Sequence, residues 1–127
     1  MATVAVCMPP IAVVQAMDSA FRAVRLWERT AFAGRFDSTV FSCTVGLRKP
    51  DPRIYRLCLR ELGVEAGDTL FVGDGANDEL AGAVRAGLRA VLIHRPGEEP
   101  IWPEARMWDG PRVTSIPEVL DHVDHDR

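Results

Sequence analysis

The sequence predicts an α/β domain, in which helices cover the faces of a mainly parallel β-sheet. Short β-branched or apolar runs, typical of buried strands, alternate along the chain with segments of helical periodicity. The chain has 127 residues, 47% of them hydrophobic, which suits one small domain with its own core. Because ligands bind at the carboxyl ends of parallel strands, functional side chains are expected there.

The first third of the chain contains four expected elements. Residues 3–6 and 11–14 are β-branched runs that predict short buried strands. Residues 19–29 follow as a helix with one apolar side and arginines elsewhere. Residues 38–45 are rich in Val, Phe and Thr, which favours a third strand.

The next helix has clear start and stop signals. Asp51 can cap it, Pro52 fits its first turn and Gly63 follows its last apolar residue. Beyond it we expect a strand over residues 69–72, a helix over 78–86, a strand over 90–93, a loop over 96–111 and a short terminal helix that starts at the S-x-x-E capping box of residues 115–118.

Composition narrows the range of partners and compartments. The net charge of −3 offers no electrostatic footprint for nucleic acid, and no apolar run reaches membrane-spanning length. The uncharged first 17 residues lack a basic leader and are interrupted by two prolines, so a signal peptide is not expected. Three cysteines without C-x-x-C spacing argue against disulfides and zinc and favour the cytoplasm. The sequence indicates no particular oligomeric state.

Lys49 is the first candidate functional residue. It lies between an expected strand and a capped helix, and it is the only lysine among fifteen basic residues. An ammonium group is a compact point charge that suits a phosphate oxygen. By position alone, a solvated loop lysine explains the residue equally well.

Asp74 and Asp78 form the second candidate group. Asp74 ends a buried apolar strand, and Asp78 lies where the next helix begins. Carboxylates gathered on one loop repel each other, and their hard oxygens suit Mg²⁺. A polar strand–helix turn with Asp78 as N-cap would explain Asp78 but not Asp74.

Two segments at matching spacing resemble motifs of the haloacid dehalogenase (HAD) superfamily. Residues 46–55, GLRKPDPRIY, look like its third motif, and residues 71–80, FVGDGANDEL, look like its fourth. Residues 83–92 and 115–120 are similar to elements that follow in the family. The resemblance implies a Rossmann-like, HAD-like fold and Mg²⁺-dependent hydrolysis of a small phosphorylated molecule.

The same resemblance implies a role for each matching residue. Lys49 would neutralise the transferring phosphoryl group, and Asp74 with Asp78 would hold Mg²⁺ directly or through water. The family's second motif is a Ser or Thr, which Ser19 would supply unless Met17 occupies the position.

The first motif, a D-x-D after an apolar strand, has no counterpart at the expected place. The D-x-D of this chain is residues 124–126, in the terminal tail, and the cap segment that normally follows the motif is also missing. We therefore expect one partial HAD-like domain over residues 1–127, apparently truncated at the N-terminus, with residues 1–11 interpreted as non-native family sequence.

Two functional hypotheses follow. In the first, the full-length protein is a HAD-like phosphoester hydrolase that acts through an aspartyl-phosphate, and this chain is a fragment that is inactive alone. In the second, the chain is a non-catalytic phosphate- or Mg²⁺-binding module with a regulatory or interaction role. An upstream DNA sequence that encodes an apolar strand ending in D-x-D would decide for the enzyme.

In the family that this chain resembles, the first motif follows the central strand of the sheet. Because the motif is absent here, another segment would have to take the place of that strand. Residues 3–6 are apolar enough to occupy it. Only four residues separate them from the strand expected at 11–14, and a parallel crossover needs a dozen or more. An antiparallel insertion is therefore the expected geometry.

Overall fold

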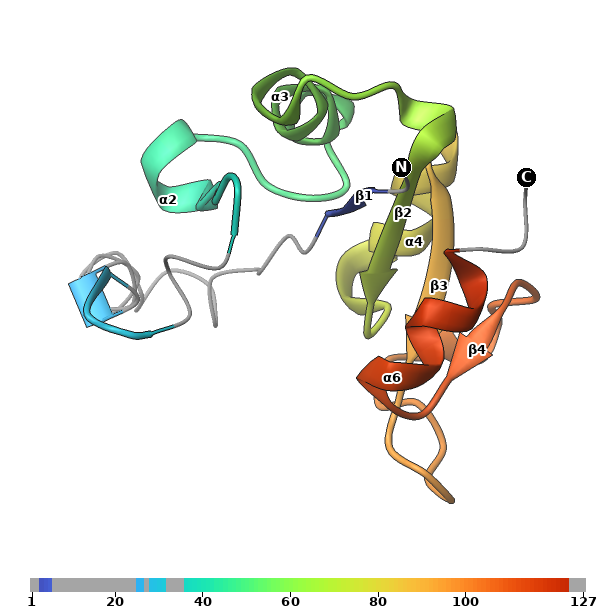
Figure 1. Ribbon diagram of the computed structural model, residues 1–127. Helices are drawn as coiled ribbons and strands as arrows, with labels where there is room; N and C mark the ends of the chain where they lie inside the picture. The colour runs from blue at the N-terminus through green and yellow to red at the C-terminus, as the bar shows by residue number, and fades with distance from the viewer. Residues whose placement is uncertain (1–2, 6–24, 27, 32–35, 124–127) are drawn as a thin grey trace.

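The sheet of this protein is parallel throughout the described chain. A computed structural model describes residues 3–5, 25–26, 28–31 and 36–123 (Figure 1). Its strands stand in the order β1-β2-β3-β4, and each neighbouring pair is parallel. The bounds are β1 Thr3–Ala5, β2 Thr69–Gly73, β3 Arg89–Ile93 and β4 Arg112–Val113. The predicted α/β class is confirmed.

Helices connect the strands and cover both faces of the sheet. The two longest are α3 and α4, and α4 is preceded by a single 3₁₀ turn. Within the described residues no helix has the length and apolar character needed to cross a membrane. The α-helices are α2 Ser42–Val45, α3 Pro52–Leu62, α4 Glu79–Arg85, α5 Pro103–Arg106 and α6 Ile116–Val119, and the 3₁₀ helices are η2 Ala66–Asp68, η3 Ala76–Asp78 and η4 Leu120–His122.

Side chains of β2 alternate between two hydrophobic clusters. Phe71 packs with Ile54 and Tyr55 of α3 and with residues of α4, while Leu70 and Val72 pack in the cluster that includes the α6 side of the sheet. This is the period of two expected for a strand that is covered on both faces. The two clusters together fix β2 as the central described element of the domain.

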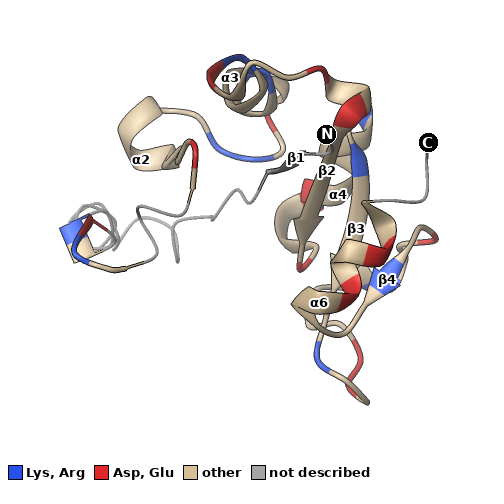
Figure 2. Cartoon of the chain, in the orientation of Figure 1, with Lys and Arg blue, Asp and Glu red and all other residues tan. Residues whose placement is uncertain are grey.

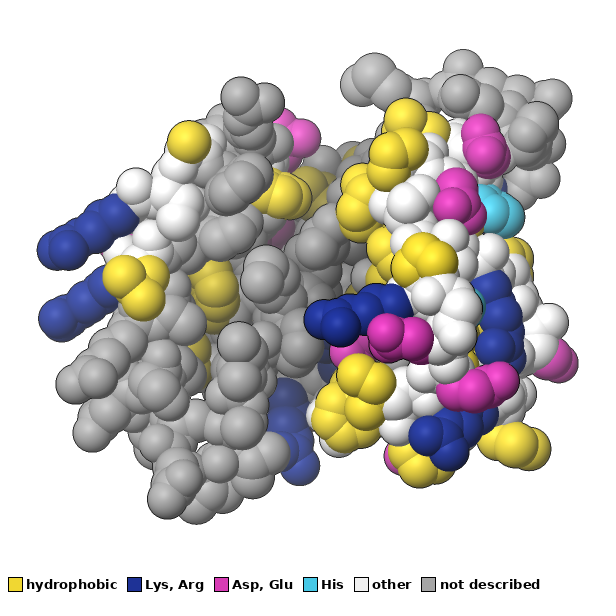
Figure 3. Space-filling model, turned by 90° about the horizontal axis from the view of Figure 1, so that it is seen from below, with side chains coloured by type: hydrophobic (Ala, Val, Ile, Leu, Met, Phe, Trp, Pro, Cys, Tyr) yellow, Lys and Arg dark blue, Asp and Glu magenta, His cyan; other side chains and the backbone are white. Residues whose placement is uncertain are grey.

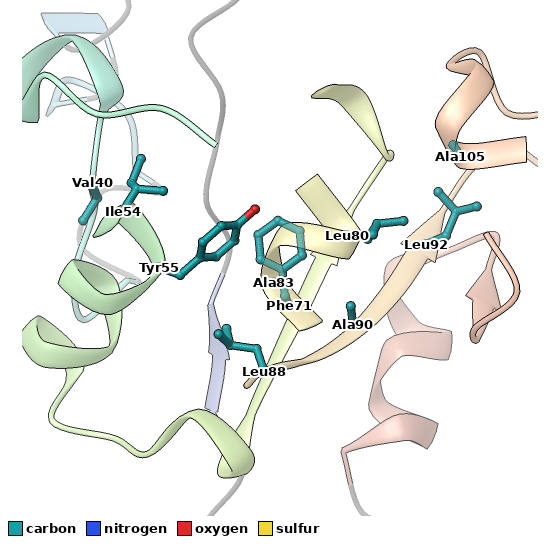
Figure 4. Close-up of a cluster of buried hydrophobic side chains, with 10 residues drawn as sticks. All are labelled: Val40, Ile54, Tyr55, Phe71, Leu80, Ala83, Leu88, Ala90, Leu92 and Ala105. Atoms are coloured by element: carbon teal, nitrogen blue, oxygen red, sulfur yellow. The ribbon is translucent and has the colours of Figure 1, made fainter. Parts of the chain in front are cut away.

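Packing between α3 and α4 is close because a glycine lies at their contact. Tyr55 of α3 is 2% exposed, donates a hydrogen bond from its hydroxyl to the carbonyl of Glu79 at 2.7 Å, and meets Phe71 edge-on at 5.6 Å (Figure 4). A Cβ on Gly82 would lie 2.7 Å from Pro50 Cβ and 2.8 Å from Tyr55 Oη. Any side chain at position 82 would therefore push the two helices apart.

The signals of α3 are confirmed in detail. The Asp51 carboxylate accepts a hydrogen bond from Arg53 N–H at 2.9 Å, and Pro52 starts the helix. Gly63 ends it in the left-handed conformation, with φ of 66°. The strand expected over 69–72, the helix expected over 78–86 and the strand expected over 90–93 also correspond to observed elements, β2, α4 and β3.

The strand predicted over residues 38–45 is wrong. Residues 42–45 form the helical turn α2, which Gly46 ends in the left-handed conformation by donating its N–H to Ser42 O. Val40 is buried against the cluster that contains Ile54, so packing rather than β-propensity determines this segment. The loop expected over 96–111 is likewise interrupted by α5, and the short strand β4 follows it.

The antiparallel insertion expected for the first strand is also wrong. β1 pairs with β2 in parallel, with Thr3 opposite Thr69. Residues 6–68 separate the two strands, which is ample for a parallel crossover. The strand predicted over residues 11–14, to which the four-residue connection would lead, lies outside the described part of the chain, as does most of the helix predicted over 19–29.

Acidic and basic residues are interspersed over the described elements. Figure 2 shows Lys and Arg segments on α3, β3 and β4, and Asp and Glu segments on α3, α6 and the loops. This agrees with the small net charge of −3. The charged residues of the described elements therefore interact mainly in individual pairs, and they do not give one face of the domain a single sign of charge.

We predict that Gly82→Ala lowers the free energy of unfolding by about 1–2 kcal/mol, because overpacking against Pro50 and Tyr55 outweighs the gain in helix propensity. Urea unfolding followed by circular dichroism measures the change. Gly67→Ala is the matched control, since nothing lies within 4 Å of a Cβ there. Equal stability of the two variants would contradict the close packing of α3 on α4.

Candidate functional site

Lys49 forms a buried ion pair with Glu79. The Lys49 Nζ atom lies 2.6 Å from Glu79 Oε2, and the two side chains are only 6% and 2% exposed. The ammonium also lies 5.3 Å from the centroid of the Phe71 ring. The chain places a lysine from the loop before α3 against the first residue of α4. Lys49 is thus a fixed, desolvated cation and not a solvated loop residue.

Two glycines make room for the Glu79 carboxylate. Its second oxygen, Oε1, accepts a hydrogen bond from Gly75 N–H at 3.0 Å. A Cβ on Gly73 would lie 2.3 Å from the same oxygen. Gly75 has φ of 88°, a conformation that favours glycine, and a Cβ there would meet Ala105 Cβ at 2.4 Å. The glycines of this loop therefore let Glu79 reach the end of β2.

Opposing effects act on the ionisation of Glu79. Burial is the largest and raises the pKa of this carboxyl, while the Lys49 charge, the Lys49 hydrogen bond and the Gly75 N–H lower it. The net direction is upward from the ordinary value. Separating Glu79 from Lys49 would leave the desolvation of the carboxylate uncompensated, so the charged form of Glu79 depends on the pair.

Asp74 follows β2 directly and is held by two donors. Its Oδ1 accepts a hydrogen bond from Ala76 N–H at 3.1 Å, and its Oδ2 accepts one from Trp102 Nε1–H at 3.0 Å. The carboxylate is otherwise exposed. Each oxygen of the carboxylate thus keeps lone-pair capacity for one further partner on the solvent side.

Asp78 lies in a strained turn. Asn77 and Asp78 both have left-handed backbone conformations, with φ of 53° and 60°. Asp78 occupies the N-cap position of α4, but its side chain makes no capping hydrogen bond within the described residues. Capping therefore does not account for this exposed carboxylate. Backbone strain of this kind is concentrated at functional sites.

The structure brings together some of the predicted residues and adds others. Lys49 joins the end of β2 through Glu79, which follows Asp78 directly and was not singled out from the sequence. The sequence predicted that Glu79 lies at the start of a helix, but it gave no sign that the side chain is buried. Trp102 lies in a loop without periodicity, so no signal pointed to it. Ser19 lies outside the described residues.

The metal site predicted at Asp74 and Asp78 has at most two protein carboxylates in the described region. Among residues 3–5, 25–26, 28–31 and 36–123, no group of three or more His, Cys, Asp or Glu side chains is placed to hold a metal ion. Two carboxylates with water and phosphate oxygens are nevertheless a common arrangement for Mg²⁺. A metal there would rely on ligands beyond this loop.

A comparison with known families covers the segments that carry the loop and the buried lysine. Residues 9–87 match the family described as haloacid dehalogenase-like hydrolase, a stretch of more than half the chain. The chain belongs to this family. The resemblance stated from residues 46–55 and 71–80 is confirmed, and the match begins earlier than those two motifs.

Relatives of the chain include two bacterial phosphatases. It is 43% identical over 84 residues to enolase-phosphatase E1 of Nocardia farcinica, covering 64% of this chain and 36% of that protein. It is 41% identical over 73 residues to phosphoserine phosphatase of Thermus thermophilus, covering 58% of this chain and 29% of that protein. The chain thus spans about a third of the length of these relatives.

Solved structures give the same fold. A HAD phosphatase from Thermococcus onnurineus aligns with a TM-score of 0.66 and 27% identity, covering 84% of this chain and 47% of that one. A dehalogenase aligns with a TM-score of 0.62 and 29% identity, covering 79% and 43%. The structural similarity confirms the predicted HAD-like, Rossmann-like fold, and the chain covers less than half of either structure.

We predict that Glu79→Gln destabilises the protein by about 3–5 kcal/mol, because it removes the carboxylate that pairs with the buried Lys49 ammonium. Adding Lys49→Met to that variant should recover part of the loss, since the buried ammonium is then gone as well. Urea unfolding of the two single variants and the double variant gives the coupling energy. Arg53→Met, which breaks the exposed pair with Asp51, is the control and should have a much smaller effect. Strictly additive single effects would contradict the pairing.

Proposed function

We propose that this chain is the phosphate- and Mg²⁺-handling half of a HAD-like phosphatase that hydrolyses the phosphate ester of a small molecule. The observation that carries the proposal is the buried Lys49–Glu79 pair beside the Asp74 loop, at the carboxyl end of β2. Parallel sheets bind ligands at this edge. Membership of the hydrolase family and the phosphatase relatives support the same reaction class.

Lys49 is the group that would neutralise the phosphoryl oxygens. Glu79 fixes its ammonium in one position, so little reorganisation is needed when a phosphate arrives. The low exposure of both side chains excludes water and strengthens the interaction of the ammonium with an added anion. Lys49 would in this way stabilise negative charge in the transition state.

Asp74 and Asp78 are the residues that would hold Mg²⁺, directly or through water. They fit the ion because both are exposed carboxylates: Asp74 is oriented by Trp102 and Ala76, and the Asp78 side chain makes no capping hydrogen bond within the described residues. Hard oxygen ligands suit this cation. When bound, the ion supplies charge stabilisation for the phosphate.

The remaining roles belong to the full-length protein. Ser19 would contact the phosphate as the second motif, and the aspartate of a first motif that this sequence lacks would form the aspartyl-phosphate. The terminal D-x-D, residues 124–126, follows no apolar strand. That observation favours the alternative function, a non-catalytic phosphate- or Mg²⁺-binding module with a regulatory or interaction role, for the 127-residue chain acting alone.

The substrate would be a small phosphorylated molecule. Relatives are named as phosphatases of phosphoserine and of glyceraldehyde 3-phosphate, and these names support the class without selecting a member. We propose a cytoplasmic setting from the cysteine pattern, and partners that include neither nucleic acid nor membrane.

We predict that Mg²⁺ shifts the backbone amide resonances of residues 73–79 and that Asp74→Asn abolishes the shifts, because the amide loses the charged oxygen ligand. Binding should be weak without a further aspartate. A titration of ¹⁵N-labelled protein by NMR measures it. Asp109→Asn, an exposed carboxylate outside the loop, is the control and should leave the titration unchanged. Persistence of the shifts in Asp74→Asn would rule out this metal site.

We predict that the purified 127-residue chain does not hydrolyse an aryl phosphate above background in the presence of Mg²⁺, because its sequence has no D-x-D motif after an apolar strand to supply the nucleophile. Release of the phenol, followed by absorbance, is the measurement. Turnover that is lost on Lys49→Ala would show that a nucleophile is present in this chain and would discard the module alternative.

A further inference from the structure

A cavity beside Asp74 is separate from the buried ion pair. Its volume is about 430 Å³, within the range of small-molecule pockets. Its lining comes from Asp74 after β2, from residues 93–96 at the end of β3, from residues 114–116 after β4 and from the loop 98–102. Three parallel strands therefore end around it. Figure 3 views the molecule from below, the side on which β2 ends, and shows apolar side chains beside both acidic and basic ones.

The wall formed by the loop is held in place by hydrogen bonds. Arg106 Nε–H donates to Pro100 O at 2.8 Å, and Arg112 donates from one guanidinium nitrogen to Trp108 O at 2.6 Å and to Arg106 O at 3.2 Å. Trp102 in turn donates to Asp74 at 3.0 Å. The wall is thus organised before any ligand arrives, which lowers the entropic cost of binding.

Apolar and aromatic groups dominate one side of this cavity. Trp102 is 40% exposed although its indole N–H is already engaged, so its ring is available for contact. Ile101 and Ile116 are 76% and 67% exposed and also line the cavity. A planar organic group would cover this apolar surface and would gain aromatic contact with the indole.

The polar groups of the cavity disfavour an anion. Asp74, Glu98 and Glu99 bring three carboxylates, and Arg95 brings one guanidinium. His94 adds an acceptor: its Nδ1 lies 3.0 Å from Arg95 O and 3.1 Å from Glu98 O. Because neither carbonyl can donate, Nδ1 carries the proton, and Nε2 is the acceptor of the neutral ring. An amine or hydroxyl donor fits this lining better than a carboxylate.

We propose that this cavity binds the organic group of the phosphate ester, and that this group is planar, largely apolar, carries an amine or hydroxyl donor and has no negative charge of its own. The assignment rests on the proposed function, since Asp74 is both a wall of the cavity and the proposed metal ligand. The phosphate would lie toward Lys49 and the organic group toward Trp102, on either side of Asp74.

Binding of three aromatic probes tests the proposal in the absence of Mg²⁺ and phosphate. Benzylamine, benzyl alcohol and benzoate have similar size but carry a cation, a neutral donor and an anion. In an NMR titration, the first two should shift the Trp102 indole N–H and the amides of residues 114–116. Benzoate should bind at least about fivefold more weakly, because the carboxylates repel it. The Trp108 indole, which donates to Pro111 O, is an internal reference and should not move.

Variants locate the site. Trp102→Ala should remove most of the response, whereas Trp102→Phe, which keeps an aromatic ring, should retain it. Ile116→Arg places a bulky cation at an exposed position and should weaken benzylamine binding about tenfold or more. Met107→Arg, 84% exposed and not part of the lining, is the matched control and should bind like the unmodified protein.

The outcomes distinguish this proposal from the proposed function. Asp78→Asn changes the other proposed metal ligand, which does not line the cavity, so it should weaken the Mg²⁺ response but keep the benzylamine response. A failure of the metal site can then be told apart from a failure of the cavity assignment. Benzoate binding as tightly as benzylamine, shifts that map away from residues 93–116, or an Ile116→Arg variant that binds normally would each overturn the assignment.

Discussion

Lys49 and Glu79 are two opposite charges that the fold removes from water, each against apolar neighbours such as Phe71. An isolated buried charge costs several kcal/mol, so each of these charges offsets part of the cost of burying the other. Their contact joins the loop before α3 to the first turn of α4, across the end of β2. The relative placement of these three segments is therefore coupled to one ion pair, and so is the position of the only lysine in the chain.

Small residues make this pairing geometrically possible. Glu79 approaches the backbone only because Gly73 has no side chain, and α4 approaches α3 only because Gly82 has none. The Tyr55 hydroxyl then satisfies the carbonyl of Glu79, so the same residue is bound through its side chain and its main chain. Close packing at the glycines and the ion pair thus favour the same placement of α4. A substitution that alters either one should therefore change the geometry of the candidate site.

The sequence predicted those features of the structure that depend on interactions between neighbouring residues, and it missed those that depend on residues far apart in the chain. The cap of α3 at Asp51, its end at Gly63 and the apolar strand β2 follow from neighbouring residues, and all three were predicted. The segment at residues 38–45 was mistaken for a strand because Val40 is held by tertiary packing against α3 and Gly46 imposes a helical turn. Glu79 was missed because its burial depends on a lysine 30 positions earlier, and Trp102 was missed because its partner Asp74 lies 28 positions earlier.

Asp74 lies between the Lys49–Glu79 pair and the cavity, both of which are at the carboxyl ends of the parallel strands. On one side its loop contributes the Gly75 N–H that binds Glu79, and so supports the cation at Lys49. On the other side its carboxylate binds Trp102 and closes the cavity against the end of β3. A ligand that changed the orientation of Trp102 would change the orientation of the Asp74 carboxylate as well. Occupancy of the cavity and metal binding should therefore be thermodynamically coupled, and by reciprocity each should alter the affinity for the other.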